Sequence, residues 1–526
     1  MSLCLAFEAA PFSIGDFHEK KHSNLWRPSL GLPSPPREMT NYLILRRLRR
    51  RSLRIKRNLD LELTANLGER EGVIDELRVL LGEEKVSTMG EVLEEHGTDR
   101  WNFSHLPEVV VFAESRDDVV AVMKFAHERE VPVTTRGAGI GYVGGCVPVK
   151  GGIALSVARM TSLVELAPED GVVVTQPGVI LKDLQDAVSE LGWYYPPDPA
   201  SLKECSIGGN LATNAGGPRC LKYGVTKNYV LGLEVVLANG EVLRVGGRCH
   251  KNKTGFDLLH LFVGSEGMLG VITEATLRII PHPQTRAMLT ATFPEFTDAA
   301  GAVQAILNAG HLPSALEIAD QFTLKAARAY LGEDSLPEGE AHLIVEIDGR
   351  ARAVAGELQE LQVVLNKAGA LSSEIHGDEE ACEKVWQLRR DFSYSLRATG
   401  LTKLNEDIVV PRSKLVDLAN FAAELEERTG ISVACFGHAG DGNIHTNLMV
   451  EDYEDAEIRE KADAALDVLF RWVLANGGVI TGEHGVGLAK KRWIKDALGE
   501  AGFAAHVTVK DALDPKGILN PGKFLD

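Results

Sequence analysis

Two pairs of adjacent glycines lie close together in residues 206–217, SIGGNLATNAGG, and this stretch constrains the fold more than any other. Because glycine has no Cβ, both pairs can adopt backbone angles that other residues avoid and can let a ligand lie directly on the main chain. Apolar residues stand among the glycines, and the apolar run VLGLEVVL follows at 230–237, which argues against a flexible linker. The stretch therefore predicts a glycine-rich loop that cradles a polar cofactor.

The composition narrows the class of protein. The chain has 526 residues, of which 44% are hydrophobic and 25% charged, so it is long enough for more than one globular core. Its formal net charge of −18 argues against a nucleic-acid partner. Its seven cysteines form no CxxC pair, which argues against a disulfide framework or a cysteine-ligated cluster. No apolar run reaches the roughly 18 residues of a membrane span. We therefore expect a cytoplasmic protein with at most peripheral membrane contact.

The N-terminal residues 1–60 differ from the rest of the chain. They contain the proline-rich segment WRPSLGLPSPPREM, and Arg46–Arg57 then places eight basic residues among twelve. Such an extension is predicted to be disordered. A basic arm that contacts anionic lipid and a mitochondrial-type presequence are alternatives, but we favour a solvated extension without a role of its own.

A βαβ unit is predicted next. Val109–Ala113 and Val131–Thr135 have the composition of strands, and the helical pattern between them begins after Ser115, a good N-cap residue. The second strand leads into Arg136-Gly137-Ala138-Gly139-Ile140-Gly141. A nicotinamide-dinucleotide fingerprint requires a helix directly after such glycines, and here a further loop and a strand follow instead. The loop still suits a pyrophosphate, which the backbone N–H groups and the arginine would face together.

Further elements follow as far as residue 280. Residues 180–192 predict an amphipathic helix, and Asn239-Gly240 between apolar runs predicts a hairpin turn. Thr254–Val263 is predicted to be helical. A third glycine loop, Gly264–Gly270, precedes the strand VITEATLRIIP.

Five motifs occur in an order that resembles a known family: RGAGIGYVGG, PPDP, SIGGNLATNAGG, KYGVT and GSEGMLGVITEATLRI. From about residue 65 onward the chain resembles the vanillyl-alcohol oxidase superfamily. It is most similar to the FAD-linked D-2-hydroxy-acid dehydrogenases, a group that includes the D-lactate dehydrogenases and the FAD-binding subunits of glycolate oxidase. The resemblance implies an α+β fold. After a helical segment at 61–104 would come a two-subdomain FAD-binding domain at 105–284, a ferredoxin-like cap with a metal site at 285–490, and a C-terminal segment at 491–526 that returns to the flavin domain.

The resemblance also implies where FAD binds. Some relatives tether the flavin through a histidine in the first glycine loop; none is present here, so we expect non-covalent FAD. Ile140 stands where relatives often carry a threonine or serine. The expected FAD-binding residues come from the five motifs and the C-terminal segment: Arg136, Gly137, Ala138, Gly139, Ile140, Gly141, Gly144, Gly145, Pro197, Asp198, Ser206, Gly208, Gly209, Asn210, Thr213, Asn214, Gly216, Gly217, Tyr223, Gly224, Glu266, Gly270, Ile272 and Asn520.

The segment CFGHAGDGNIHTN, residues 435–447, is the densest chemical signal. A turn at 440–443 would form a hairpin with His438 directly across from His445, where Cβ atoms are about 4.5–5.5 Å apart and both rings can reach one divalent ion. Two unrelated, hydrogen-bonded histidines are the alternative. Glu483 would complete a two-histidine, one-carboxylate set with an open position, as in catalytic sites. The resemblance implies His438, His445 and Glu483 as ligands and His484 as the base. Zinc fits this set, and manganese or iron would also fit.

Substrate contacts are expected from two further segments. Arg389, in the sequence WQLR, resembles the family's carboxylate-binding arginine, and Arg390 is the alternative. Asn447 would bind substrate or support a ligand histidine. Relatives that act on hydroxyglutarate place a lysine near residues 405–411, and its loss here argues against a second carboxylate on the substrate.

The resemblance implies that a D-2-hydroxy acid is oxidised to the 2-oxo acid, with hydride passing to the flavin and the hydroxyl proton to His484. D-Lactate is the first substrate, and glycolate and D-2-hydroxyglutarate are alternatives. The acceptor would be a quinone, a cytochrome, an electron-transfer flavoprotein or an iron–sulfur partner. Two other functions remain open: a non-catalytic FAD-carrying subunit of an oxidase complex, and a non-redox relative of the alkyl-glycerone-phosphate synthase type.

Overall fold

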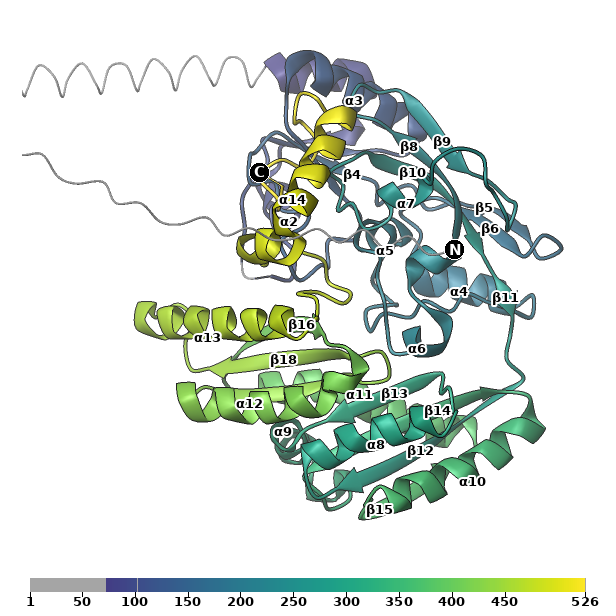
Figure 1. Cartoon of the computed structure of the whole chain (residues 1–526). Coiled ribbons are helices and arrows are strands. Elements are labelled where there is room, and N and C mark those ends of the chain that lie inside the picture. The colour runs from purple at the N-terminus through teal and green to yellow at the C-terminus, as the bar shows by residue number, and fades with distance from the viewer. Residues whose placement is uncertain (1–71, 102, 526) are drawn as a thin grey trace, which may run out of the picture. The chain divides into compact units, whose positions relative to one another are not determined.

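The computed structural model describes residues 72–101 and 103–525, and the basic and proline-rich segment expected at 1–60 lies outside them. A helix spans residues 72–81, followed by the short strand β1 (Val86–Ser87) and helix α2 (Gly90–His96). The described residues belong to one unit of the chain, residues 70–526. Figure 1 shows this unit in chain order, from purple to yellow.

The first sheet contains the predicted βαβ unit. Its strand order is β1-β2-β4-β3, with β2 (Val109–Phe112), β3 (Val133–Arg136) and β4 (Ile153–Ser156), and both β2 and β3 pair in parallel with β4. Helix α3 (Arg116–Arg129) connects β2 to β3. As predicted, Ser115 caps this helix: its hydroxyl accepts from the backbone of Asp118, whose carboxylate accepts from Ser115 in return.

The second sheet has the order β5-β6-β10-β8-β9 and carries the other half of this region. Its pairs are antiparallel, and the predicted turn at Asn239-Gly240 joins β8 to β9. The predicted helix at 254–263 forms only at Leu259–Phe262. The elements of this part are β5 (Leu163–Ala167), β6 (Val172–Thr175), α4 (Leu181–Ser189), β7 (Trp193–Tyr194), α5 (Ile207–Thr213), α6 (Cys220–Tyr223), β8 (Val230–Val236), β9 (Val242–Gly246), α7 (Leu259–Phe262), β10 (Val271–Arg278) and β11 (Ile280–Pro281).

The glycine-rich stretch at 206–217 is not a loop throughout, which corrects the prediction from sequence. Residues 207–213 form helix α5, and the hydroxyl of Ser206 caps it by accepting from the N–H of Gly209. Glycines occur in this helix because its backbone packs closely on a neighbour: a Cβ on Gly208 would lie 2.7 Å from Cβ of Pro177. The helix ends at Asn214, which has a left-handed backbone conformation.

The third sheet confirms a ferredoxin-like cap. Its order is β15-β12-β14-β13-β17-β18-β16, and its first half places the fourth, first, third and second strands side by side, as in that fold. The remaining strands extend the sheet, with every recorded pair antiparallel. The strands are β12 (Thr285–Phe293), β13 (Ala315–Ala319), β14 (Ala341–Gly349), β15 (Ser372–His376), β16 (Thr402–Val409), β17 (Ser432–His438) and β18 (Asn443–Val450).

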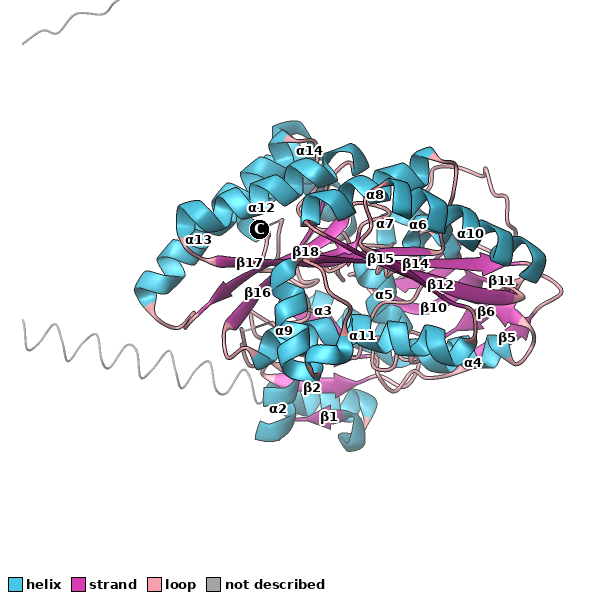
Figure 2. Ribbon diagram, turned by 90° about the horizontal axis from the view of Figure 1, so that it is seen from below, coloured by secondary structure: helices cyan, strands magenta, loops and turns pink. Residues whose placement is uncertain are grey.

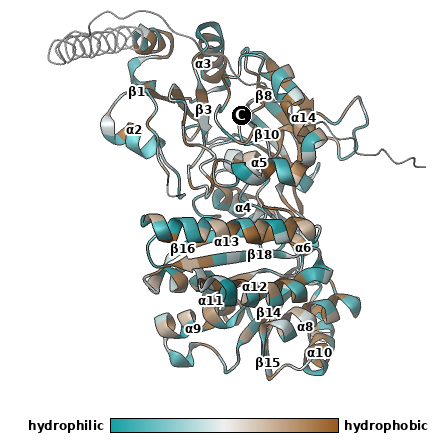
Figure 3. Ribbon diagram, turned by 60° about the vertical axis from the view of Figure 1, so that its left-hand side comes forward, coloured by the Kyte–Doolittle hydropathy of each residue, from teal (hydrophilic) through white to brown (hydrophobic). Residues whose placement is uncertain are grey.

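Helices cover the two faces of this sheet unequally. Figure 2 shows one layer with α8 (Phe296–Asn308), α10 (Ala351–Lys367), α12 (Leu415–Thr429) and α13 (Ala456–Ala475), and the opposite layer with α9 (Gln321–Leu331) and α11 (Glu379–Ala398). The four-helix side contains the largest apolar core. Figure 3 shows the apolar strands enclosed between helices that carry both polar and apolar residues. The side with α9 and α11 carries smaller apolar clusters, which leaves room on that face for polar side chains.

The C-terminal part packs against the first two sheets. After helix α14 (Ile494–Leu513), Leu519 forms a bridge with Val133 in β3, and Asn520 donates from Nδ2 to the carbonyl oxygens of Gly145 and Glu266. These contacts agree with the expected return of the chain, while the domain limits at 104, 284 and 490 stay predictions. Across the residues described, none of the helices combines the length and apolar character needed to cross a membrane.

Candidate active site

The first two glycine motifs lie directly against each other. A Cβ on Gly137 would lie 2.5 Å from the hydroxyl oxygen of Ser206, and that hydroxyl also accepts from the N–H of Ala138 at 3.2 Å. Asn210, at 4% exposure, has an Nδ2 atom without a hydrogen-bond partner among the described residues. The two glycine motifs leave their backbones close together, and the buried donor of Asn210 beside them has no protein partner among the described residues. A polar cofactor can bind in such a place, so these residues fit the phosphate-bearing part of FAD.

Several expected FAD-binding residues use their side chains to hold the protein together. Arg136 donates to the carbonyl of Thr98 and to Sγ of Cys146, and it packs beneath Gly139 rather than extending from the loop. Asn214 accepts from the N–H of Lys227 through its side-chain oxygen. The role of such residues is therefore to shape the cradle.

The other predicted FAD-binding residues differ in how much free space lies beside their backbone. Gly145 and Gly209 have room beside them, whereas Gly270 packs on Val235 and a Cβ there would lie 2.5 Å from Cγ1 of that valine. The remaining residues, which lie in the same loops or at their edges, are Ile140, Gly141, Gly144, Pro197, Thr213, Gly216, Gly217, Gly224 and Ile272.

Glu266 connects the third glycine loop to the loop after β18 and α13. It has a left-handed backbone conformation and is 8% exposed. Its carboxylate accepts from the N–H groups of Val486 and Gly487, at 2.7 and 2.8 Å. Burial raises its pKa, and these two N–H groups oppose that rise. A residue expected to contact FAD thus anchors the segment that carries Glu483 and His484.

The structure brings the three predicted metal ligands together. One ligand atom from each of His438, His445 and Glu483 lies within 4.8 Å of the other two. Oε1 of Glu483 is 3.5 Å from Nε2 of each histidine. Two imidazole nitrogens and a carboxylate oxygen at this spacing fit a zinc, manganese or iron ion.

The hairpin register differs from the predicted one. His438 pairs with Asn443 and His445 pairs with Phe436, so the two histidines are diagonal neighbours and not directly opposite. Residues 443 and 445 point to the same face of β18, so both imidazoles still reach the same space, with ring centroids 5.4 Å apart. The difference arises because the turn lies one residue earlier in the sequence than predicted, at 439–442.

Glu317, which the sequence did not single out, supports His438. Its Oε1 lies 2.6 Å from Nδ1 of His438, and its Oε2 accepts from Nε of Arg389, also at 2.6 Å. Burial would lower the pKa of His438, but the charges of Glu317 and Glu483 raise it well above its ordinary value. The contact fixes the ring so that Nε2 faces His445 and Glu483, as carboxylates commonly orient metal-binding histidines.

His484 lies beside this group. Its ring stacks on His445 with centroids 5.5 Å apart, and Tyr142 lies 5.4 Å away on the side of the first glycine motif. Its Nε2 is 3.9 Å from Oε1 of Glu483. Burial and the neighbouring His438 and His484 hold the pKa of His445 well below its ordinary value.

Asp407 positions the loop that carries Glu483 and His484, and sequence reasoning assigned it no role. Its Oδ2 accepts from the hydroxyl of Thr481 and from the N–H groups of residues 482–484 at 2.8–3.0 Å, and its Oδ1 accepts from Asn443 at 2.7 Å. Burial would raise its pKa, but the charges of His484 and Lys490 and these N–H groups lower it well below the ordinary value. The residue is fully buried and ionised.

The predicted substrate contacts also line this face of the sheet. Arg389 lies over the ring of Phe436, with Cζ 4.7 Å from the ring centroid. Within the described residues its hydrogen bond is to Glu317 through Nε, so both terminal nitrogens remain for an anion. Asn447 donates to the carbonyl oxygens of Ala434 and His445, and its Oδ1 is buried without a partner in the described part of the chain. Arg390, the alternative, pairs with Glu383 on the protein surface.

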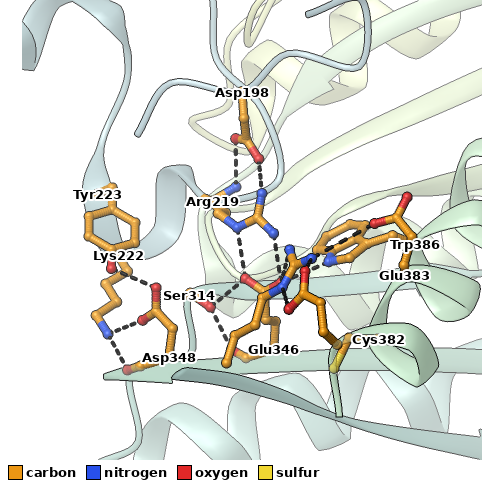
Figure 4. A network of polar contacts seen from close by, with 12 residues as sticks. Asp198, Arg219, Lys222, Tyr223, Ser314, Glu346, Asp348, Cys382, Glu383 and Trp386 are labelled. Carbon is orange, nitrogen blue, oxygen red and sulfur yellow. Dashed lines mark hydrogen bonds and ion pairs between the residues drawn. The ribbon is translucent and has the colours of Figure 1, made fainter. Parts of the chain in front are cut away.

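A buried polar network joins the glycine motifs to the cap, as Figure 4 shows. Arg219, just before α6, donates to both carboxylate oxygens of Glu346 in β14 at 2.7 Å and also to Asp198 of the PPDP motif. Trp386 donates to the same Glu346 at 2.7 Å. The carboxylate of Asp198 accepts from Arg219, and the expected contact of Asp198 with FAD stays a prediction.

Two neighbouring residues extend the network. Lys222 and Tyr223 both contact the carboxylate of Asp348 at the end of β14, the tyrosine hydroxyl at 2.6 Å. Trp386 lies one helical turn before Arg389 in α11. The network therefore fixes the helix that carries Arg389, the arginine predicted to bind substrate, relative to the glycine motifs.

Comparison with known proteins shows the family of the chain. A family model for an FAD binding domain matches residues 107–246, and one for the C-terminal domain of FAD linked oxidases matches residues 282–524. The chain is 37% identical to glycolate oxidase subunit GlcD of Bacillus subtilis, over 80% of this chain and 90% of that protein. It is also 37% identical to a D-lactate dehydrogenase of Archaeoglobus fulgidus, over 79% of this chain and 91% of that protein.

Among solved structures, the fold resembles that of 4-ethylphenol oxidase from Gulosibacter chungangensis. The TM-score is 0.71 at 20% identity, and the match covers 87% of this chain and 97% of the other. At this identity the similarity shows a shared fold, which is the α+β architecture expected from the motifs.

Proposed function

Because the chain belongs to the family of FAD-linked oxidases, we propose that it oxidises a D-2-hydroxy acid to the corresponding 2-oxo acid with the help of a divalent metal ion. D-Lactate and glycolate are the first substrates to test, since relatives that bear the names of both enzymes share 37% of the sequence. One observation carries the proposal: His438, His445 and Glu483 converge within 4.8 Å, with His484 directly beside them.

The two bound groups would divide the chemistry. FAD supplies the hydride acceptor, and a divalent ion, zinc by its ligand set with manganese or iron as alternatives, supplies a Lewis acid that acidifies the substrate hydroxyl. The glycine motifs around Gly137 and Ser206 would hold FAD without a covalent bond. The two histidines and Glu483 would hold the ion.

The chain's own residues then have distinct roles. The terminal nitrogens of Arg389 bind the substrate carboxylate, and Glu317 fixes the arginine through Nε. His484 accepts the hydroxyl proton at Nε2, the ring nitrogen on the side of Glu483. Its Nδ1 is 3.9 Å from Oδ2 of Asp407, whose negative charge stabilises the imidazolium that results. Tyr142 covers the ring on the other side and limits access of water.

The electron acceptor is proposed to be a separate, non-nicotinamide molecule. Within the described residues, the grouped metal-ligating side chains are those of His438, His445 and Glu483, which include no cysteine. A quinone, a cytochrome, an electron-transfer flavoprotein or an iron–sulfur protein would accept the electrons. The alternative of a non-catalytic FAD-carrying subunit is weakened by the presence of both a ligand set and a base.

The proposal is tested by flavin reduction under anaerobic conditions. D-Lactate or glycolate should bleach the flavin absorbance of the purified protein, L-lactate should not, and a chelator should abolish the reaction. His484→Ala should slow reduction by about 10²–10⁴-fold, the usual contribution of a general base. His506→Ala, which changes an exposed histidine in α14, is the matched control. An unchanged reduction rate in His484→Ala would instead favour a non-catalytic FAD-carrying subunit.

A further inference from the structure

A pocket lies where the loop that follows the proposed base meets helix α14, which is yellow in Figure 1. Its volume is about 500 Å³, which is within the range of small-molecule sites. Its walls come from residues 488–495, from α14 and from the C-terminal segment. The residues that line this cavity, here called the α14 pocket, include none of those expected to bind FAD, metal or substrate. It is therefore separate from the candidate active site.

The inner wall of the α14 pocket is apolar. Leu488, Ile494, Phe503 and Phe524 line it. Ile494 and Phe524 belong to the largest apolar core, and Leu488 and Phe503 are half-buried. Water gains little from such a wall, so an apolar chain that displaces it is favoured there.

The rim of the α14 pocket is positively charged. Three basic residues and no acidic residue are among the described residues that line it. Arg492 is paired with two aspartates of α13. Lys491 donates to the carbonyl oxygen of Gly522 at 3.0 Å, and the ammonium of Lys495 is 4.9 Å from the ring centroid of Phe503. Neither lysine forms an ion pair with a carboxylate within the described ranges.

This combination is specific in its demands on a ligand. The whole chain has a formal net charge of −18, so an anion is attracted only where positive charge is locally concentrated. The ammonium of Lys495 lies over an aromatic ring of the apolar wall, which places the charged and apolar contacts side by side. A ligand that satisfies both has one anionic end and an apolar body.

We propose that the α14 pocket binds an amphipathic carboxylate, with its apolar chain against Phe503 and Phe524 and its carboxylate between Lys491 and Lys495. A medium-chain fatty acid has this chemistry. The inference goes beyond the proposed function and does not depend on it, because none of the residues involved has a role in hydroxy-acid oxidation.

Two walls of the α14 pocket connect it to the expected cofactor cradle. Leu488 packs on the first glycine loop, where a Cβ on Gly144 would lie 2.9 Å from Cδ1 of Leu488. Phe524 directly follows Lys523, whose ammonium donates to the carbonyl oxygen of Val147. A ligand between these walls holds both segments against the first glycine loop. We therefore expect its binding to strengthen the binding of FAD.

Calorimetric titration of the FAD-loaded full chain with octanoate tests the site. Octanoate should bind at one site per chain. 1-Octanol, which has the same chain and no charge, should bind about 10-fold more weakly, as expected for a lost charge-assisted hydrogen bond. Acetate, which has the charge and no chain, should not bind. Equal affinities for octanoate and 1-octanol, or no binding of octanoate, would overturn the proposal.

Two variants separate the charged contact from the apolar one. Lys495→Gln should weaken the binding of octanoate about 10-fold and leave that of 1-octanol unchanged. Phe503→Ala should weaken the binding of both. Lys384→Gln, which changes an exposed lysine paired with Glu380 in α11, is the matched control and should bind octanoate as the parent does. Parent-like octanoate binding by Lys495→Gln would place the anion elsewhere and overturn the assignment.

The amount of flavin that stays bound during gel filtration measures the link to FAD. Octanoate in the buffer should raise it in the parent and not in Lys495→Gln, and equal retention would overturn the link. Sedimentation velocity identifies a second copy of the chain as a competing occupant. A mass that rises with protein concentration and falls again with octanoate would favour that copy and overturn the small-molecule assignment.

Discussion

At the scale of single residues, Asp407 shows how one carboxylate can determine the shape of a catalytic loop. Four donors from residues 481–484 converge on its Oδ2, and they fix the backbone on both sides of Glu483 and His484. A buried carboxylate that accepts several N–H groups is stable only as an anion. The positions of the proposed metal ligand Glu483 and of the proposed base His484 therefore depend on one buried side chain.

Asp407→Asn should loosen this loop. The amide keeps the size of the side chain but removes the charge, and its NH2 group cannot accept from the loop. We expect a loss of about 3 kcal/mol in unfolding free energy, together with weaker metal retention and a fall in kcat/KM. Metal content after dialysis and the urea midpoint measure these effects. Asp417→Asn, at an exposed ion pair with Lys414, is the control. Parent-like metal content in Asp407→Asn would contradict the assigned role.

The sequence predicted some of these residues and not others for a physical reason. His438 and His445 belong to one hairpin, so their spacing brought them into view, and the roles of Glu483 and His484 came from the resemblance to the family. Glu317 and Asp407 contribute through pairing between strands that are distant in the chain, and a single sequence does not reveal that register. Residues 405–411 lack a lysine, so we expected no second carboxylate on the substrate, and that expectation stays a prediction.

At the scale of elements, the contact between the glycine motifs and β14 depends on a buried ion pair. Burial alone would raise the pKa of Glu346, but the charge of Arg219 and hydrogen bonds from Arg219, Trp386 and Ser314 lower it to about 2. Figure 4 shows how these donors surround the carboxylate. The ordinary value is 4.5, so the ionised group favours the folded state.

This pKa predicts a specific acid sensitivity. A depressed pKa in the folded state contributes stability above pH 4.5, and that contribution is lost as the pH falls from 4.5 towards 2. The shift corresponds to about 3 kcal/mol. The free energy of unfolding, measured with urea, should therefore fall across this window by more in the parent than in Glu346→Gln. Glu379→Gln, at an exposed position, is the control. If the free energy of unfolding depends on pH in the same way in the parent and in Glu346→Gln, Glu346 is not the source of the acid sensitivity.

Sequence patterns predicted most elements but not every boundary. Capping of α3 by Ser115 and the turn at Asn239-Gly240 are local, and both are confirmed. Helix α5 was predicted as a loop because glycine disfavours helices in isolation. Gly208 of this helix packs against Pro177, which is distant in the chain, and a single sequence cannot show that contact. The predicted register of the hairpin formed by β17 and β18 was wrong for a similar reason, because the closing pair of a turn depends on the neighbouring strands.

At the scale of the whole molecule, the last residues complete the glycine cradle. Asn520 donates to the carbonyl oxygens of Gly145 and Glu266, which belong to the first and third glycine loops. Lys523 is buried and donates to the carbonyl of Val147. A segment from the far end of the chain therefore holds together two loops that are expected to line FAD.

Asn520→Gly should lower the FAD content of the purified protein. Glycine tolerates the backbone φ of 44° at this position, so the substitution removes the amide without introducing strain. Losing two hydrogen bonds should weaken FAD binding about 10-fold or more. The ratio of flavin to protein absorbance after gel filtration measures this. Asn476→Gly, whose amide bonds within its own helix end, is the control. Full flavin content in Asn520→Gly would contradict this role.

The contact of Glu266 with Val486 and Gly487 has a practical consequence. One carboxylate ties the third glycine loop, which is expected to line FAD, to the backbone next to the proposed metal ligand and the proposed base. We therefore predict that binding of FAD and binding of the metal ion are thermodynamically linked, in which case each strengthens the other by the same factor. A preparation stripped of its flavin should also release its ion more readily, and a chelated sample should lose colour on storage. Samples for activity measurements therefore need both groups restored together.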